Sequence, residues 1–560
     1  MLQKTLFISA FLTLTGIMVC PADAGRRDEA TLARYVPAEA PLFVEVIDAP
    51  AVLERAETSP LVQLLKALDP KRDKHAAKRA KWRHDVSALM NMPADQAIET
   101  YAGIRFALIG GGGKDRFVVL SRVPEKDAYT RLVSAVKAAP AGEYHGATLS
   151  SINDGQTLLA HVKGVLVIGS AVHRELFEAS LDRLGGRGGP VLADDKDFKT
   201  QTSKLPDGAK LLIFVRPNAV VSRQQKKLKI ILDNVPACAL GGYLLPDGEE
   251  LRLSARLDTE KLISPPAKPI RPTLMTKLDA RTIGAVWASV DISERLSGDQ
   301  ADDKKSSPRK PAPGLAVLRI LQSVIPDKDP AEWLDEHIGG QAAMFVTTLP
   351  GKEASPVQDG PVPVFGFMIE IKNPDGVRPV VRQLATTFLM IANLALTKEH
   401  PELLLRIERE NVGGALIEYV DGEALAKTKT DVSFFHTLDL AWMLSDDRLV
   451  VASSREYLRR LARGKGGSIR SNPRLREVLG GPGDKANVIA FLDFGKTSSL
   501  IESLLPDTEP TQATLRRPFE AAKRALPFLK RMEAAALRIR IDNNQSTARG
   551  VLRENVGTQP

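Results

Sequence analysis

A glycine run that ends in a lysine, GGGGK at residues 110–114, is the first feature whose residue types could bind a phosphate. A phosphate-binding loop needs Ser or Thr after its lysine and a helix after the loop. Here Asp115 follows the lysine, and a strand-like apolar stretch comes next. We therefore expect a hairpin turn at this position.

Two further motifs lack the residues that must accompany them. Asp493-Phe494-Gly495 matches the metal-binding tripeptide of protein kinases, but the HRD loop and the strand lysine are missing, so we expect the polar end of a strand. Gly169-Ser170 lacks the second glycine of a G-x-S-x-G nucleophile turn. Its later counterpart, Ser453, stands three residues before Glu456, a spacing that favours helix capping over catalysis.

The histidines and cysteines form no metal-ligand pattern, because no H-E-x-x-H pair or cysteine cluster is present. We therefore assign no catalytic, cofactor-binding or metal-binding residue and expect no cofactor, although a site private to one half of the chain stays open. The histidines beyond the leader are His75, His84, His145, His161, His173, His337, His400 and His436.

The amino terminus has the pattern of a secretory signal peptide. Lys4 precedes an apolar stretch at residues 6–19, and Ala22-Asp23-Ala24 fits the small-x-small cleavage rule. We expect cleavage near Ala24 and export to the periplasm or the medium. Lipoprotein processing at Cys20 is disfavoured because the bulky Val19 precedes it.

Removal of the leader leaves Cys238 as the only cysteine, so no internal disulfide can form. Its neighbours, VPACAL at residues 235–240, predict a buried and unreactive thiol. No later stretch reaches the ~20 apolar residues that a membrane span requires. We expect no transmembrane segment in the mature chain.

The 560 residues are 43% hydrophobic and 26% charged, which is ordinary for globular protein, and the net charge is +9. Seven basic residues fall within residues 71–83. A solvated helix face is the favoured interpretation of this segment, and contact with an anionic envelope surface is the functional alternative. Nucleic acid is not an expected partner of an exported chain. The seven residues are Lys71, Arg72, Lys74, Lys78, Arg79, Lys81 and Arg83.

The clearest pattern is an internal repeat. An apolar strand, a small-residue turn and a helix occupy residues 165–184, and a similar stretch follows at residues 448–464. Gly169-Ser170 corresponds to Ala452-Ser453, and Arg174-Glu175 corresponds to Arg455-Glu456. Further matches occur in the same order elsewhere, so the sequence predicts a tandem duplication.

The predicted organisation is a signal peptide at 1–24, a first repeat at 25–257, a Pro-rich linker at 258–277 and a second repeat at 278–560. Short, hairpin-like connections favour the α+β class: each repeat is expected to be a mainly antiparallel sheet with helices packed on one face. A long helix in the second repeat is expected to bury Val377, Val380, Val381, Leu384, Phe388 and Ile391. Ordinary core packing is the favoured interpretation of that helix, and the wall of an apolar cavity is the alternative.

Several stretches resemble an exported bacterial family, the domain-of-unknown-function 3352 family. They are PLFVEV at residues 41–46, Tyr144-His145-Gly146, VLVIGS at residues 165–170 and LADD at residues 192–195. The resemblance covers much of the first repeat and, more faintly, the second. It implies export and a repeated α+β architecture, and it implies no activity, partner or site residue.

Three functional hypotheses follow. The first is a non-catalytic envelope protein that binds or scaffolds a partner. The second is a periplasmic carrier of a lipid or another apolar ligand, enclosed between sheet and helices. The third is an enzyme of a type that these motifs do not identify.

Overall fold

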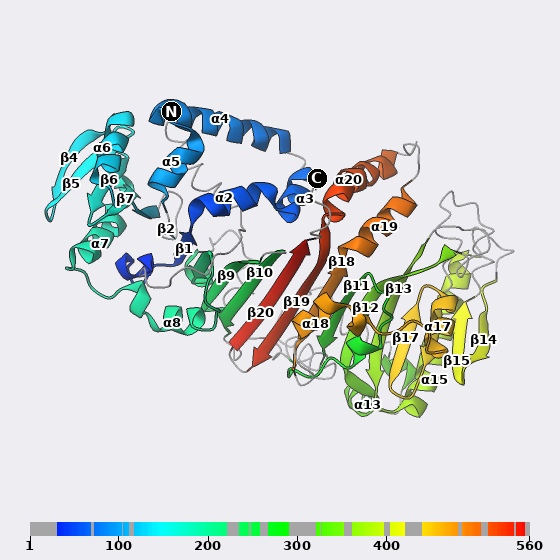
Figure 1. Cartoon of the computed structure of the whole chain (residues 1–560). Helices are drawn as coiled ribbons and strands as arrows, with labels where there is room; N and C mark the ends of the chain where they lie inside the picture. The colour runs from blue at the N-terminus through cyan, green and yellow to red at the C-terminus, as the bar shows by residue number, and fades with distance from the viewer. Residues whose placement is uncertain are drawn as a thin grey trace. The chain divides into compact units, whose positions relative to one another are not determined.

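The computed structural model describes residues 31–68, 72–103, 105–110, 117–220, 235–245, 248–257, 267–290, 321–325, 328–351, 361–396, 404–420, 440–479, 484–505, 513–542 and 545–554. The predicted signal peptide and Cys20 lie outside these residues. The chain divides into two compact units. Figure 1 labels the helices and strands of both. Unit 1 comprises residues up to Lys261 with Glu520–Met532 and Asn543–Pro560, and unit 2 comprises Leu262–Phe519 and Glu533–Asp542.

The sheet of unit 1 is antiparallel in all of its described pairings. Its strands lie in the order β4-β5-β6-β7-β3-β2-β1-β8-β9-β10-β20. Their bounds are β1 Leu42–Ile47, β2 Arg105–Gly110, β3 Phe117–Arg122, β4 Ala139–Tyr144, β5 Ala147–Ile152, β6 Thr157–Val162, β7 Val165–Ser170, β8 Leu211–Val215, β9 Ala237–Leu245, β10 Gly248–Arg256 and β20 Gln545–Glu554.

Strand β20 explains why the carboxyl-terminal segments belong to unit 1. It pairs with β10 over nine residues, from Gln545 opposite Arg256 to Arg553 opposite Gly248. We predicted that residues 278–560 form the second repeat. The sequence does not indicate that β20 joins unit 1, because a strand pairing across almost 300 residues leaves no local signal.

Helices cover both faces of the unit 1 sheet. One face packs against η1, α7, η3 and α8, and the other packs against α2, α4, α5 and α6. We expected helices on one face only. The second face is covered because successive residues of the central strands are apolar, as in Phe43-Val44 and Leu108-Ile109, so both sides need burial. The helices are η1 Leu32–Tyr35, α2 Ala49–Thr58, α3 Pro60–Leu68, α4 Arg72–Met90, α5 Ala94–Tyr101, α6 Lys126–Ala135, η2 Ala171–His173, α7 Arg174–Gly185, η3 Leu192–Asp194, α8 Lys196–Thr202 and α9 Pro217–Val220.

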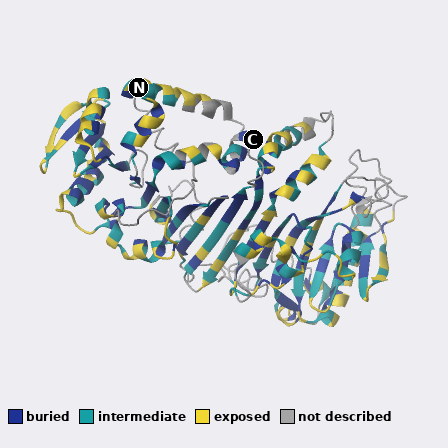
Figure 2. Cartoon of the chain, in the orientation of Figure 1, coloured by how far each residue is buried: buried dark blue, intermediate teal, exposed yellow. Residues whose placement is uncertain are grey.

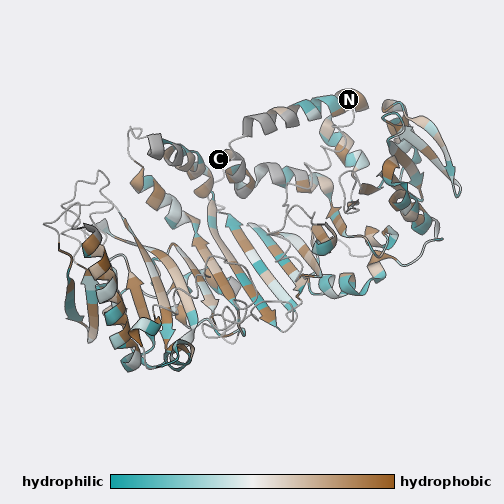
Figure 3. Ribbon diagram, turned by 180° about the vertical axis from the view of Figure 1, so that it is seen from behind, coloured by the Kyte–Doolittle hydropathy of each residue, from teal (hydrophilic) through white to brown (hydrophobic). Residues whose placement is uncertain are grey.

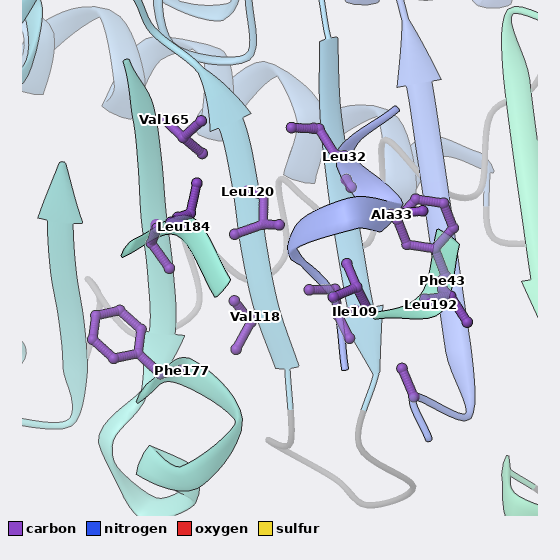
Figure 4. Close-up of a cluster of buried hydrophobic side chains, with 14 of the residues drawn as sticks. Leu32, Ala33, Phe43, Ile109, Val118, Leu120, Val165, Phe177, Leu184 and Leu192 are labelled. Atoms are coloured by element: carbon purple, nitrogen blue, oxygen red, sulfur yellow. The ribbon is translucent and has the colours of Figure 1, made fainter. Parts of the chain in front are cut away.

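The strand, turn and helix at residues 165–184 lie at the centre of one of these cores. All six residues of β7 are buried, and α7 places Phe177, Leu181 and Leu184 against the sheet, as the apolar spacing predicts (Figure 4). Gly169 permits this packing. A Cβ at Gly169 would stand 2.7 Å from the Phe177 ring, which is closer than van der Waals contact allows.

The sheet of unit 2 is also antiparallel in its described pairings, in the order β14-β15-β16-β17-β13-β12-β11-β18-β19. The strands are β11 Gly284–Ser289, β12 Ile338–Leu349, β13 Val362–Ile371, β14 Ile407–Val412, β15 Ala415–Val420, β16 Ala441–Leu444, β17 Arg448–Ala452, β18 Val488–Asp493 and β19 Met532–Asp542. The helices of this half are η5 Leu274–Lys277, α13 Pro330–His337, α15 Pro374–Leu396, α17 Arg455–Ala462, η7 Ile469–Ser471, α18 Pro473–Leu479 and α19 Phe494–Leu504, and α20 Ala513–Leu529 precedes β19.

The strand order is the same in the two units. If the first nine strands of each are numbered along the chain, both sheets run 4-5-6-7-3-2-1-8-9. Helices and antiparallel strands make up both units, so the predicted α+β class is confirmed.

The end of the predicted linker is part of unit 2. Leu274 and Met275 of η5 are buried, and the Leu274 N–H donates to Gln341 Oε1 at 3.0 Å. Four prolines predict an extended chain over residues 258–277. Instead, η5, which carries Leu274 and Met275, packs against β12 and β13. Residues 258–266 lie outside the described part. Among the described helices, none is both long and apolar enough to cross a membrane.

Candidate functional site

The candidate site is a row of side chains that crosses five strands of unit 2. Val286 of β11 lies opposite Met344 of β12, and Met344 lies opposite Phe367 of β13. On the other side, Val286 lies opposite Ala490 of β18, which lies opposite Leu537 of β19. Directly opposed residues project from the same face of a sheet. At a strand spacing of about 4.8 Å the row is about 19 Å wide.

Most of this row is exposed to solvent. Met344 is 65% exposed and Val286 is 50% exposed, and Phe367 and Leu537 are 38% and 37% exposed. Leu492, on the same face of β18, is 36% exposed. We call these five residues the apolar sheet face: Val286, Met344, Phe367, Leu492 and Leu537.

The neighbours of these residues along the strands point to the opposite face and are buried there. Ala285, Trp287 and Phe345 are at most 4% exposed. An antiparallel sheet with one solvated face normally alternates apolar and polar residues. These strands are apolar on both sides, and a contiguous exposed apolar patch marks a contact site for a partner or a ligand.

The equivalent face of unit 1 is covered. Helices α5 and α6 lie on it, just as α13 and α15 of unit 2 lie on the face that carries Phe367. Val44, Leu108 and Val119 of unit 1 face one another across β1, β2 and β3 and are at most 8% exposed. Within the described residues, the two units therefore share a strand order and differ in the exposure of this face.

Helix α15 covers only part of the unit 2 face. Val377 and Val380 are buried against Ile369 and Ile371 of β13, as predicted, and Leu384 packs partly buried beside them. Figure 2 shows buried positions interspersed with intermediate and exposed ones along the strands of unit 2, and Figure 3 shows α15 as a largely hydrophobic helix at the edge of unit 2.

The expected burial of Phe388 and Ile391 is wrong, because they are 63% and 58% exposed. In the second half of α15 the sheet-facing side turns to Ala385, Leu389 and Ala392, which pack around Trp442. The apolar stripe that begins at Val377 consequently continues into solvent.

A cluster of polar side chains lies at the edge of unit 1. His145 Nδ1 is 2.7 Å from Asp182 Oδ1, and the Tyr144 hydroxyl donates to Asp182 Oδ2 at 3.0 Å. Burial raises the pKa of Asp182, but hydrogen bonds from His145 and Tyr144 outweigh it and leave that pKa below its usual value. Burial, followed by the bond to Asp182, raises the pKa of Tyr144.

This cluster fastens the β4–β5 hairpin to α7. In unit 2 an ion pair connects the corresponding helix and strand, α17 and β14. Arg459 of α17 donates to both carboxylate oxygens of Glu410 on β14, at 2.7 and 2.6 Å. An ion pair in the same place indicates that the contact positions a hairpin, so we interpret His145 and Asp182 as structural.

No family model and no curated protein matches this chain. Among solved structures, crystal forms III and I of TP0453 each match at 13% identity with a TM-score of 0.26, over 41% of this chain and 81% of that one. Crystal form IV matches at 11% identity with a TM-score of 0.25, over 43% and 82%. We base no argument about fold or function on likenesses of this size.

The motifs singled out in the sequence have structural places. Strands β2 and β3 flank the glycine run and pair antiparallel, as a hairpin requires, while residues 111–116 themselves lie outside the described part. Asp493 ends β18 and caps α19, accepting from the Lys496 N–H at 2.9 Å. The predicted cap at Ser453 is displaced by one residue: Ser454 caps α17, and Ser453 Oγ accepts from the Phe365 N–H.

The described histidines do not gather. His161 contacts the Val123 carbonyl and stacks on Tyr129, and His337 is buried on Trp333. His75 has no described side chain, and His400 and His436 lie outside the described residues. Within the described part of the chain, no group of three or more His, Cys, Asp or Glu side chains is placed to hold a metal ion.

The basic segment forms helix α4, as predicted. Lys81 lies 4.0 Å from Asp85, and Arg83 lies 3.2 Å from Asp95. Lys71 lies outside the described residues, and the side chains of Arg72, Lys74, Lys78 and Arg79 are not described.

Cys238 lies on β9, half-buried, and burial raises the pKa of its thiol to about 11.

Proposed function

We propose that this chain is an exported, non-catalytic envelope protein that binds or scaffolds a partner, and that the apolar sheet face of unit 2 is its contact surface. The observation that carries the proposal is the exposure of Val286 and Met344 in the middle of a five-strand apolar row. Burial of such side chains by a partner contributes about 25 cal/mol per Å². The leader-like residues 1–24 support the proposed export.

We also propose that the two units arose by tandem duplication and belong to the domain-of-unknown-function 3352 family. The shared strand order and the matching stretches at 165–184 and 448–464 support the duplication. On this proposal, unit 1 kept the face closed by helices, and unit 2 presents it for binding.

A carrier of a lipid or another apolar ligand is the second candidate. The observation that favours it is α15, whose second half is apolar on the side against the sheet and on the side away from it. In this second candidate α15 is the wall of an apolar ligand site, a role separate from partner binding at the apolar sheet face.

Native mass spectrometry of the protein isolated from the envelope distinguishes the two. A partner protein that is present with the wild type and lost from the Val286→Gln, Met344→Gln double variant supports the proposal. A small apolar mass that remains bound to both proteins, with no partner protein lost, favours the carrier. A bare protein mass for both proteins, after mild chemical cross-linking, contradicts both. Val172→Gln, at a 73% exposed position of unit 1, is the matched control.

A further inference from the structure

Strand β20 pairs with β10, and the two strands hold the same place in their repeats. Two residues separate β9 from β10, and two residues separate β19 from β20. On the proposed duplication, on which this inference rests, β20 is therefore the counterpart of β10. Both strands belong to unit 1, and Figure 1 shows them side by side.

The register of this pair is symmetric. The first residue of β10 lies opposite the ninth residue of β20, and the first residue of β20 lies opposite the ninth residue of β10. The fifth residues, Arg252 and Arg549, lie opposite each other at the centre. An interface in which equivalent positions exchange the same contacts is self-complementary, so the same register fits two identical strands.

The charged side chains of β10 suit a second β10 strand better than they suit β20. Glu250 contacts Arg252 on its own strand and Arg549 across the pair, with 3.1 Å between Glu250 Oε1 and Arg549 Nε. One carboxylate thus serves two guanidinium groups, because the third residue of β20 is Thr547. In a pair of β10 strands the third residue of each is Glu250, which gives two carboxylates for two arginines.

The apolar side chains of β10 point to the same partner. Leu251 lies opposite Gly550 and is 38% exposed. In a pair of β10 strands the fourth residue, Leu251, lies opposite the sixth residue, Leu253, and apolar cross-strand pairs stabilise a sheet.

Two β20 strands do not complement each other in this way. Arg549 would lie opposite Arg549, and β20 has no acidic residue before Glu554 to balance the pair. Like charges directly opposite each other destabilise a sheet. Self-complementarity in this register is therefore a property of β10.

Helix α2 holds β20 at β10 in the intact chain. Arg55 of α2 contacts Glu554 of β20, and its Nε lies 3.4 Å from Glu249 Oε1 of β10. One guanidinium group thus joins the two strands on the face that α2 covers. We propose that β10 is a self-complementary dimerisation strand: β20 occupies it within one chain, and when β20 is displaced its partner is the β10 strand of a second copy of this chain.

The full chain with β20 displaced tests the proposal. Ala548→Pro with Arg549→Pro interrupts the pairing, because one of two successive strand residues directs its N–H at β10 and proline has none to donate. Leu251→Cys and Leu253→Cys are each introduced into this proline variant, with Cys238→Ala to remove the native thiol. Under mild oxidation we expect an equimolar mixture of the two proteins to form a disulfide-linked dimer.

Each cysteine variant alone is the matched control. Position 251 lies two residues out of register with position 251 of the second copy, at a Cα separation of about 7–8 Å. That separation is too long for a disulfide. The mixture should therefore link at least tenfold more than either protein alone. Glu250→Gln in the proline variants should reduce the linking, because it removes the carboxylates that balance the arginines.

Three results would overturn the proposal. They are a folded proline variant whose mixture does not link, equal linking by either cysteine variant alone, and equal linking by the mixture when β20 is native. Near-UV circular dichroism reports folding, and a chain that ends at Asn544 replaces the proline variant if that variant does not fold. Val286→Gln with Met344→Gln should leave the linking unchanged, so failure here is distinguishable from failure of the sheet-face proposal.

Discussion

Replacement of Gly169 by alanine should destabilise unit 1, and a second substitution should rescue it. The added Cβ would stand 2.7 Å from one ring carbon of Phe177 and 3.1 Å from the Phe177 Cβ. Phe177 is fully buried in a close-packed core and cannot move aside without displacing its neighbours. Overpacking of this kind costs about 1–3 kcal/mol.

The rescue follows from unit 2, where Ala452 at the end of β17 and Leu458 in α17 occupy the matching places and are both buried. Phe177→Leu alone should lower stability by about 1 kcal/mol through lost packing. Gly169→Ala with Phe177→Leu should cost no more than Phe177→Leu alone, so the two substitutions couple by the cost of Gly169→Ala, about 1–3 kcal/mol. Urea unfolding followed by far-UV circular dichroism measures all four proteins. Additive losses would refute the packing argument and weaken the proposed correspondence between the repeats.

Three further predictions concern single contacts. Arg459 holds the pKa of Glu410 below its usual value chiefly through their hydrogen bonds; the pair therefore stabilises the fold above the unfolded pKa of about 4.3 and loses that effect as the pH falls through the lower folded value. Arg459→Ala should lower the free energy of unfolding by about 1 kcal/mol at neutral pH and leave it unchanged at pH values below both pKa values of Glu410. Urea unfolding at several pH values measures the loss, and a loss that does not depend on pH would contradict the assigned ion pair. Gln341→Leu removes the Oε1 acceptor that lies 3.0 Å from the buried Trp287 indole nitrogen. The free energy of unfolding, followed by tryptophan fluorescence, should fall by about 1–3 kcal/mol. An unchanged unfolding midpoint would exclude the contact. The Cys238 thiol, with a pKa of about 11, should react with iodoacetamide at pH 8 much more slowly in the native protein than in urea, as peptide mass spectrometry of the labelled site would show; equal rates would contradict its burial.

The α+β class and many of its elements could be predicted from local patterns. The β-branched run of β7 and the apolar spacing of α7 specify a buried strand and an amphipathic helix, and both lie where expected. The antiparallel pair of β9 and β10 can be predicted in the same way, because the turn residues Pro246-Asp247 separate two apolar runs. These features depend on neighbours within a few residues, which a sequence displays directly.

Long-range arrangements could not be predicted in the same way. The pairing of β20 with β10 depends on which edge of unit 1 is free, and nothing in residues 545–554 encodes that. The exposure of Phe388 depends on where the cover over α15 ends. Periodicity shows that a helix side is apolar, but it does not show whether another element reaches it.

The apolar sheet face was missed for a related reason, although a signal exists. The segment VPVFGFMIEI at residues 362–371 is apolar at successive positions, which is typical of a strand buried on both faces. The sequence therefore indicates two apolar sides at β13. It does not reveal that Phe367 and the side chain opposite it, Met344, stay exposed.

Photo-cross-linking in living cells tests most directly the central claim that the apolar sheet face is a contact surface. A benzophenone amino acid replaces Met344 in one variant and Val172, which is equally apolar and 73% exposed, in another. We predict a discrete adduct from position 344 that disappears when Val286→Gln is added, and no such adduct from position 172. The absence of any adduct at 344, or the same adducts from both positions, would contradict the account.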